Sequence, residues 1–447
     1  MKYQAYPEYK DSGVEWLGDV PEHWKTPCLR WYINIASGEG LSNTDFDKVY
    51  DGVNRFRVIG GNGTLGYSAQ FNTSSKAFAI GRVGALCGNI HFINEICWIT
   101  DNALKLSAWV ELHDHYFFFL LKAAKLNEYA SITAQPLITG EQVKALRIVI
   151  PPIREQQNIA NFLDHETAKI DTLIEKQQQL IKLLKEKRQA VISHAVTKGL
   201  NPNAPMRESG VEWLGDVPEH WNVYKLKHII TSLESGVSVN AADIPAYGDG
   251  LGVLKTSCVY TRSFRVEENK TVLKEEENRV KCPIRKGAII ISRMNTPDLV
   301  GASALVEVDD TNIYLPDRLW QTIFASNIKL NPKFISFFMM IKGFRNQISL
   351  AAEGASSSMQ NIAKDDYLSI NITLPDIAEQ DVIVSHLENK LGYFQKLEER
   401  ANKAIELIQE RRTALISAAV TGKIDVRSWQ APEPLHSNKE TYKEEIA

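Results

Sequence analysis

Two long stretches of the chain carry apolar side chains at seven-residue intervals between charged and amide side chains. The first follows Pro151 and Pro152 and contains no further proline or glycine before Gly199. Apolar side chains with this spacing, repeated four residues after each, predict a long helix that packs along one stripe against another helix. The second stretch repeats the pattern in the same register. The stripe consists of Leu163, Ile170, Ile174, Ile181, Leu184 and Val191, and then of Leu387, Leu391, Phe394, Ile405, Ile408 and Leu415.

Burial of these stripes requires a partner surface, because each large apolar side chain contributes about 1.5–3 kcal/mol when it leaves water. The simplest arrangement packs the two helices against each other. A pseudo-two-fold axis between the halves of the chain would make the pair an antiparallel coiled coil. Its seam from Leu163 to Ala195 would be roughly 50 Å long, or at most about 15 base pairs of DNA. Leu173 and Leu180 would widen the stripe, and three polar members would either fix the register or lie at a solvated edge: Gln177, Arg188 and Glu398.

The chain also contains an internal repeat. The sequence SGVEWLGDVPEHW occurs twice without a mismatch, at Ser12–Trp24 and at Ser209–Trp221. An insert separates each copy from the helical stretch that follows, at Lys25–Arg147 and Trp221–Ile372, and the two inserts align poorly with each other. The repeat is either a duplication without functional meaning or a frame for two different binding domains. Identical connectors around dissimilar inserts favour the frame.

Each insert alternates short apolar runs with turn residues and ends in a helical patch. This mixture predicts an α/β or α+β fold for both inserts. Strands are expected at Lys76–Ile80, Ala288–Ser292 and Gly301–Val308, and helices at Tyr116–Asn127 and Phe334–Ile348.

Composition changes this picture little. The chain has 447 residues and a net charge of −3, and the first insert has 11 basic and 10 acidic residues between Lys25 and Leu146. A DNA-binding face would therefore have to be built from selected residues, since phosphate neutralisation drives DNA binding. The five cysteines form no C-x-x-C pair, and no apolar run is long enough to span a bilayer. We expect a cytoplasmic protein without membrane contact.

Catalytic signatures are absent from the sequence. It contains neither a G-x-x-x-x-G-K-[ST] phosphate loop nor the Asn/Asp-Pro-Pro-aromatic tetrapeptide of amino-methyltransferases. His113 and His115 flank Asp114, a spacing open to a metal ion, but we interpret the three residues as a surface turn. No catalytic residue, metal site or cofactor is therefore assigned to this chain.

Candidate DNA contacts follow from side-chain chemistry. Arginine reads guanine and asparagine or glutamine reads adenine through two hydrogen bonds, whereas lysine and threonine mostly contact phosphates. GGNGTLGY at Gly60–Tyr67 predicts a hairpin turn, either alone or with a DNA contact from its asparagine. For each candidate the alternative is a structural hydrogen bond or a solvated charge. The candidates are Asn62, Lys76, Arg82 and Gln135 in the first insert, and Arg293, Asn295, Thr296, Arg318, Gln321 and Gln360 in the second.

The ordered set of motifs resembles the specificity subunit of type I restriction-modification enzymes. The similar segments are the two SGVEWLGDVPEHW boxes, GGNGTLGY, AIGRVGALCGNI, WITDNAL, KGAIIISRMNTPDLVG, LPDRLWQ and the helix entries PPIREQQ and LPDIAEQ. The resemblance implies two target-recognition domains that bind an asymmetric, interrupted site in double-stranded DNA. It further implies two methyltransferase subunits and two motor-nuclease subunits as partners, which would carry S-adenosylmethionine and ATP with magnesium.

On this interpretation the chain divides into seven parts. They are a box at 1–24, a target-recognition domain at 25–150, a spacer helix at 151–200, the repeated box at 201–221, a second target-recognition domain at 222–374, a second spacer helix at 375–424 and a tail at 425–447. Two other functions remain open. The chain is otherwise a self-sufficient methyltransferase or nuclease with unrecognised motifs, or a coiled-coil scaffold that binds only proteins.

Overall fold

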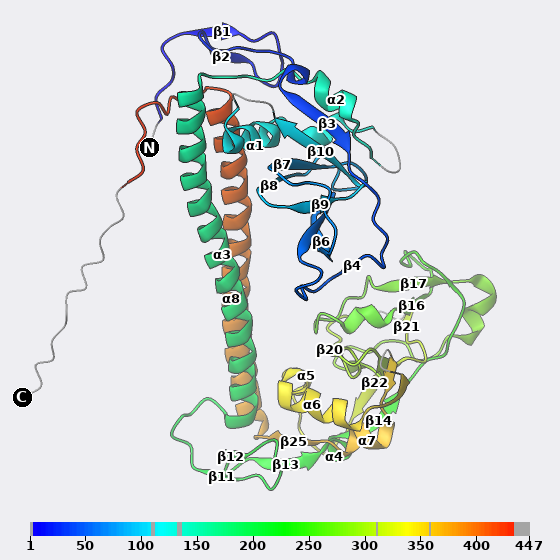
Figure 1. Ribbon diagram of the computed structural model, residues 1–447. Coiled ribbons are helices and arrows are strands. Elements are labelled where there is room, and N and C mark those ends of the chain that lie inside the picture. The colour runs from blue at the N-terminus through cyan, green and yellow to red at the C-terminus, as the bar shows by residue number, and fades with distance from the viewer. Residues whose placement is uncertain (1–2, 109–111, 132–135, 310–311, 357–358, 433–447) are drawn as a thin grey trace, which may run out of the picture. The chain divides into compact units, whose positions relative to one another are not determined.

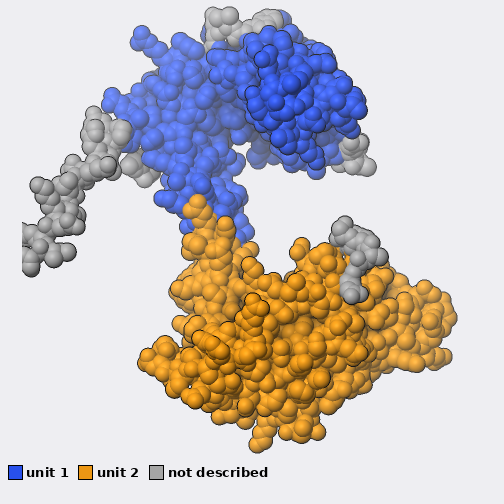
Figure 2. All heavy atoms as spheres, turned by 60° about the horizontal axis from the view of Figure 1, so that its bottom comes forward, with its two compact units in different colours: residues 1–178, 402–447 blue, residues 179–401 orange. Residues whose placement is uncertain are grey.

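A computed structural model describes residues 3–108, 112–131, 136–309, 312–356 and 359–432 of the chain. These residues form two compact units, 1–178 with 402–447 and 179–401. Figure 2 colours the two units. Each unit contains one insert, folded as a mixed α and β domain, together with part of each long helix (Figure 1). We call these domains reader 1 and reader 2.

In unit 1 the first box forms a small antiparallel ribbon of β1 (Tyr9–Asp11) and β2 (Asp19–Pro21), and reader 1 follows it along the chain. Reader 1 has two four-stranded sheets, in the orders β3-β10-β7-β8 and β4-β6-β5-β9. Their bounds are β3 Ile33–Ser37, β4 Phe46–Asp47, β5 Phe56–Gly60, β6 Gly63–Ser68, β7 Ala77–Gly81, β8 Ile90–Ile93, β9 Cys97–Ile99 and β10 Ala103–Ala108. The helical segments are η1 Leu29–Trp31, α1 Asp114–Ala123, η2 Leu126–Tyr129 and α2 Gly140–Ala145.

Unit 2 repeats this plan after the second box, β11 (Met206–Glu208) and β12 (Asp216–Pro218). Reader 2 has sheets in the orders β14-β22-β18-β20 and β15-β17-β16-β21, and two smaller sheets, β13-β25 and β19-β24-β23. The strands are β13 Asn222–Lys225, β14 Ile230–Glu234, β15 Ala241–Ala242, β16 Gly252–Leu254, β17 Asn269–Val272, β18 Ile289–Ser292, β19 Met294–Asn295, β20 Ser303–Leu305, β21 Ile313–Tyr314, β22 Leu319–Phe324, β23 Glu353–Ser356, β24 Met359–Asn361 and β25 Asn371–Leu374. The helical segments are α4 Leu226–Ile229, η3 Thr256–Val259, η4 Lys274–Arg279, α5 Pro332–Met340, α6 Lys342–Ala351 and α7 Lys364–Ser369.

The two readers therefore share one topology although their sequences align poorly. The strand orders correspond position by position, and each second sheet contains one parallel pair, β5 with β9 and β16 with β21. The main difference is the connection between the second and third strands of this mixed sheet along the chain, β5 to β6 in reader 1 and β16 to β17 in reader 2. In reader 1 it is the two-residue turn Gly61–Asn62, as the Gly-Asn-Gly motif predicts, whereas in reader 2 it is the segment 255–268 with η3.

The long helices are α3 (Ile153–Lys198) and α8 (Ile377–Val420). Each ends before a glycine with positive φ, Gly199 at 77° and Gly422 at 74°, a conformation that glycine adopts without strain. All twelve predicted apolar seam residues are buried or half-buried. Leu173 and Leu180 do not widen the stripe: they are 48% and 43% exposed, because they fall outside the inward face.

In each unit the two long helices share a hydrophobic core. In unit 1, Leu163 and Ile170 of α3 lie in one cluster with Leu415 and Ala419 of α8. In unit 2, the end of α3 meets the start of α8 in a second cluster, through Ile192, Ala195, Ile383 and Leu387. Within the described residues, none of the helices is both long and apolar enough to cross a membrane.

A Glu-Gln pair at the start of each long helix joins the helix to its box and reader. In unit 1, Glu155 accepts a hydrogen bond from Trp24 Nε1 at 2.9 Å and contacts His23 Nε2 at 2.7 Å. The neighbouring Gln156, almost fully buried, accepts from the backbone N–H of His113, which precedes α1, at 2.9 Å. The box and the first helix of the reader are thereby fixed to one end of α3.

Unit 2 contains the same joint. Glu379 accepts from Trp221 Nε1 at 3.0 Å, and Gln380 accepts from the backbone N–H of Asn331 at 2.9 Å. Gln380 also donates to the carbonyl oxygen of Pro375 at 3.0 Å. The identical boxes and the two Glu-Gln motifs thus form one repeated attachment for two different readers.

Because Gln380 is buried and forms two hydrogen bonds in this joint, we expect its replacement by a side chain of similar size to destabilise the protein strongly. Gln380→Met removes both buried hydrogen bonds and leaves the Asn331 N–H and the Pro375 carbonyl without them. We expect the free energy of unfolding to fall by about 2–4 kcal/mol, since each unsatisfied buried group costs about 1–3 kcal/mol. Denaturant unfolding measures the effect. The control is Gln395→Met on the exposed face of α8, which should change stability by less than about 0.5 kcal/mol; equal effects of the two variants would contradict the prediction.

Candidate nucleic-acid interface

Arg82 stands directly after β7, a central strand of reader 1. Its backbone N–H donates to the carbonyl oxygen of Asn102 at 3.0 Å, and its own carbonyl accepts from the N–H of Ile138 at 3.0 Å. These two bonds tie the end of β7 to the residue before β10 and to the segment before α2. The backbone at Arg82 is therefore held on both sides by reader 1.

Arg293 occupies the corresponding position in reader 2, directly after β18. Its N–H donates to the carbonyl oxygen of Arg318 at 3.1 Å, and its carbonyl accepts from the N–H of Ile362 at 3.1 Å. The predicted residues Arg82 and Arg293 are thus equivalent in the two readers, which the sequence analysis did not recognise. Both side chains are half-buried, and the Nε atom of each is buried without a hydrogen-bond partner in the described structure.

The hairpin turn of reader 1 lies against the end of β7. A Cβ atom on Gly61 would lie 3.0 Å from the Asn102 oxygen and 3.3 Å from the Cα of Gly81, so any other residue would push this backbone apart by a few tenths of an ångström. Asn62 at the tip is exposed, and its Oδ1 lies 3.4 Å from Nδ2 of Asn89. The turn thereby brings Asn62 to the same edge of the reader as Arg82.

The other two candidates of reader 1 do not join this edge. Lys76 precedes β7, at the opposite end of the strand from Arg82, and its Nζ forms an ion pair with Asp114 at 2.6 Å. Gln135 lies outside the described residues. Of the four candidates, the structure brings together Asn62 and Arg82.

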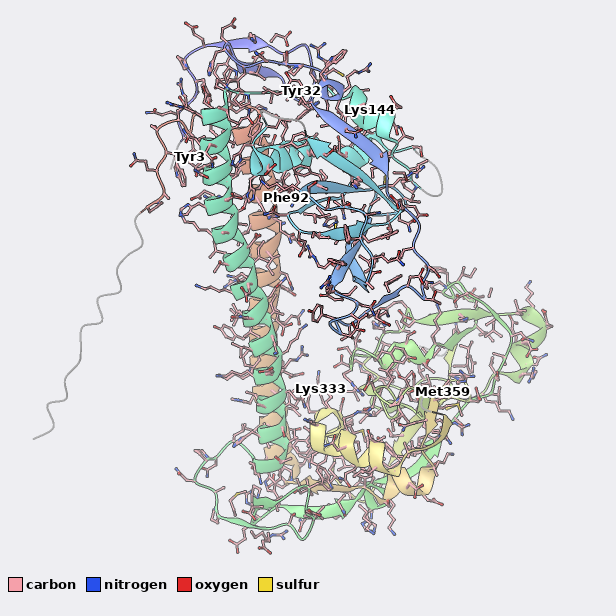
Figure 3. All side chains as sticks on the ribbon, viewed as in Figure 1. Tyr3, Tyr32, Phe92, Lys144, Lys333 and Met359 are labelled. Atoms are coloured by element: carbon pink, nitrogen blue, oxygen red, sulfur yellow. The ribbon has the colours of Figure 1, made fainter. Side chains whose placement is uncertain are left out.

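Reader 2 exposes Thr296 and Arg318 beside the half-buried Arg293. Gln360 is half-buried on β24, where it pairs with Asn295 of β19. These residues share the edge of reader 2 that corresponds to the Arg82 edge of reader 1. Met359, labelled in Figure 3, begins β24 beside them.

Two candidates of reader 2, Asn295 and Gln321, are buried. Gln321 has no exposed surface, and its amide accepts from the N–H of Arg285 at 2.9 Å and donates to the Pro283 carbonyl at 3.1 Å. Asn295 is 8% exposed and donates to Tyr260 Oη at 2.8 Å. In the described structure both side-chain amides form hydrogen bonds inside the protein.

Asn102 was missed by the sequence analysis. Asn102 directly precedes β10, and Arg318 directly precedes the corresponding strand β22. The carbonyl oxygen of Asn102 accepts from the N–H of Arg82, and that of Arg318 accepts from the N–H of Arg293. The signal was present, because WITDNAL and LPDRLWQ both place aspartate before this position, at Asp101 and Asp317. Aligning those motifs would have predicted the equivalence.

The histidine pair lies at the start of helix α1 and not in the expected surface turn. His113 caps α1 by accepting from the N–H of Tyr116, and His115 Nδ1 lies 2.7 Å from Asp164. Burial, and then the neighbouring His115, lowers the pKa of His113, which favours the neutral ring that a capping acceptor requires. Among the described residues no group of three or more metal-binding side chains is found.

Comparisons with known proteins agree with this architecture. The family model for the type I restriction modification DNA specificity domain matches residues 25–183 and 218–407. The EcoBI specificity subunit of Escherichia coli is 22% identical over 96% of this chain and 91% of its own length. The MjaVIII specificity subunit of Methanocaldococcus jannaschii is 24% identical over 77% of this chain and 78% of its own length.

Solved structures show the same fold. A chain from a study of complex assembly and conformational transition of the type I R-M system matches with a TM-score of 0.65 and 14% identity, over 91% of this chain and 99% of that chain. The family match on both halves shows that this chain belongs to the type I restriction-modification DNA specificity subunits, the non-catalytic DNA-recognition subunits of these enzymes.

Proposed function

We propose that the two readers recognise the two unlike halves of an interrupted, asymmetric site in double-stranded DNA. The observation that carries this proposal is the shared backbone frame at Arg82 and Arg293, which presents different neighbours in the two readers. Reader 1 offers Asn62 and Asn102, whereas reader 2 offers Arg318. Equivalent positions with unlike donors and acceptors suit two different base sequences.

The individual side chains have distinct roles in this proposal. Arg82, Arg293 and Arg318 read guanine, and Asn62 reads adenine, because these side chains form paired hydrogen bonds with those bases. Thr296 and Lys76 contact phosphates of the DNA, and the side-chain amides of Gln360 and Gln135 also contact the DNA. Asn295 and Gln321 support the edge from inside the protein.

The long helices act as a ruler between the readers in this proposal. They form an antiparallel coiled coil with pseudo-two-fold symmetry, and its length sets the gap in the DNA target. Support comes from each unit separately, since the start of α3 shares a core with the end of α8 in unit 1, and the end of α3 shares one with the start of α8 in unit 2. In unit 1, Arg412 of α8 also contacts Asp171 of α3 at 3.3 Å.

The helices also provide the docking surface for partners in this proposal. Two methyltransferase subunits bind the spacer, two motor-nuclease subunits join for restriction, and these partners carry S-adenosylmethionine and ATP with magnesium in the cytoplasm. Exposed apolar side chains on the helices support a protein partner there. They include Leu173, Leu180, Leu183 and Leu407, each at least 43% exposed.

DNA binding by the chain alone and by its complex with methyltransferase subunits tests the function. We expect sequence-specific binding and adenine or cytosine methylation in the complex, and no methylation by the purified chain with S-adenosylmethionine. Methylation by the chain alone would support an enzyme. A complex that binds no DNA would support a scaffold that binds only proteins.

A further inference from the structure

A groove with a volume of 680 Å³ runs along the edge strand β8 of reader 1. Its walls come from β8, from the second half of α1 and from Asp164 of α3, all within unit 1. Phe92, labelled in Figure 3, lies on β8 and lines the groove together with Phe118 of α1.

Positive groups predominate in the lining of this groove. Lys122, Lys125 and Arg57 line it, and the one lining carboxylate, Asp164, is engaged by His115 at 2.7 Å. Arg57 and Lys125 have acidic partners of their own. Among the described residues, Lys122 has no carboxylate within ion-pair distance, so its charge remains uncompensated in the groove.

The surroundings of Lys122 make this charge costly. The side chain is half-buried, with Nζ 4.4 Å from the centre of the Phe118 ring. Burial, and then the guanidinium of Arg412, lowers the pKa of Lys122, while Asp171 raises it. Asp171 is itself paired with Arg412 at 3.3 Å. A partly desolvated ammonium without its own carboxylate gains free energy from an incoming anion.

His91 offers a second unsatisfied group in the same groove. It lies on β8, and its Nε2 atom is buried without a hydrogen-bond partner in the described structure. Burial, and then Lys122, lowers the pKa of this imidazole, while an interaction with the backbone of Gly61 raises it. A buried ring nitrogen without a partner is a polar group that a bound ligand or water can satisfy.

The groove is continuous with the candidate DNA edge. Gly63 and Thr64 of the hairpin line it, and so does Asn89, whose amide lies 3.4 Å from Asn62 Oδ1. Resting on the proposed function, we propose that this groove holds a backbone phosphate of the DNA whose bases face Arg82, with Lys122 as the principal cation.

Unit 2 provides a natural comparison. Its corresponding groove has a volume of 360 Å³ and is lined in part by residues 261–264 of the long β16–β17 connection. The position equivalent to Lys122, counted from the residue that precedes each helix, is Met340. Lys333, labelled in Figure 3, is the lysine of that groove, and both Glu307 and Glu388 pair with it at 2.7 Å. Arg188 and Arg262 also line this groove, and neither forms an ion pair among the described residues, so the comparison identifies the counterpart of Lys122 and the proposal is confined to the groove of reader 1.

The comparison suggests Lys122→Met as the test, since this substitution places in unit 1 the methionine that unit 2 has at the equivalent position, Met340. The variant is measured in the full chain assembled with its methyltransferase subunits, by titration of target and unrelated duplexes at several salt concentrations. We expect binding to both duplexes to weaken about threefold to tenfold and the slope of log K against log salt to become shallower by about 1, as for the loss of one phosphate contact. Lys122→Arg should retain the wild-type slope.

Lys144→Met is the matched control. Lys144, on α2 of reader 1 and labelled in Figure 3, lies outside the groove and pairs with Glu141 at 2.8 Å. We expect the wild-type slope from this variant. A Lys122→Met complex with wild-type melting temperature, slope and affinity would overturn the inference, and so would a change in the preferred base sequence.

Two further results separate the sources of the phosphate and the two proposals. Calorimetric titration with inorganic phosphate, without DNA, should show no saturable binding below about 10 mM. Binding that Lys122→Met abolishes, with an unchanged DNA slope, would assign the groove to free phosphate and overturn the DNA contact. If the wild-type complex binds no DNA, the proposed function fails, whereas loss of the Lys122 effect alone contradicts only the groove.

Discussion

Replacing Arg82 by lysine is expected to weaken binding of the cognate DNA about 5- to 150-fold, equivalent to about 1–3 kcal/mol. Lysine keeps the charge but lacks the planar fork that forms two hydrogen bonds with guanine. The loss should therefore appear as relaxed discrimination at one base pair in one half of the target. Titration of the complex with single-substitution duplexes measures this change.

Two matched variants sharpen this prediction. Ser37→Ala removes the oxygen that accepts from Arg82 Nη1 at 3.0 Å and leaves the guanidinium in place, so it should cost much less than Arg82→Lys. Arg293→Lys, at the equivalent position of reader 2, should relax one base pair in the other half of the target. If both arginine variants relaxed the same half, the assignment of one half to each reader would be wrong.

Deleting one heptad from both long helices is expected to abolish binding to the original target, with an affinity loss of more than about 100-fold. Residues 174–180 of α3 and 398–404 of α8 are equivalent heptads, so their joint removal keeps the seam in register. The deletion shortens the helix pair by about 10 Å, which is the length of about three base pairs. Three base pairs are about a third of a helical turn of DNA. The readers would then face the wrong part of the original site.

A duplex series with varied gaps checks the ruler. The shortened protein should bind best to a target whose gap is about three base pairs smaller and whose two half-sites are unchanged. Circular dichroism of the variant controls for intact helices. An unchanged preferred gap, with unchanged affinity, would contradict the ruler.

The long helices were predictable because their pattern is local and repeated. An apolar stripe of period seven, proline before the start and glycine after the end determine both their faces and their limits. Leu173 and Leu180 show the limit of that reasoning. In the sequence, a leucine next to the stripe suggests a wider apolar face. Whether Leu173 and Leu180 are buried depends on how much of that face the partner helix covers.

The common topology of the readers was not predictable in the same way. Their strands span two to six residues, and each parallel pair joins segments far apart in sequence, such as β5 with β9. The helical patch expected at Phe334–Ile348 is two helices, because the backbone is extended at Ile341, with φ −70° and ψ 148°. Such breaks depend on packing between elements and leave little trace in short apolar runs.

The candidate site was predictable in chemistry and less so in exposure. Arg82 and Arg293 were selected because arginine can form two hydrogen bonds with guanine, and the structure places them at equivalent positions. Gln321 has similar chemistry, but it lies on the central strand β22, where its amide bonds the backbone. The residue type alone does not show whether a polar side chain is exposed or buried, because alternate residues of a strand face opposite sides of the sheet.

Sequencing of methylated bases in DNA treated with the assembled complex tests the central claim most directly. The wild-type complex should methylate one interrupted, asymmetric sequence, Arg82→Lys should broaden only one half of it, and Arg293→Lys only the other. A methylated sequence without a gap, or one in which neither variant changes either half, would contradict the claim that two dissimilar readers on one frame determine the target.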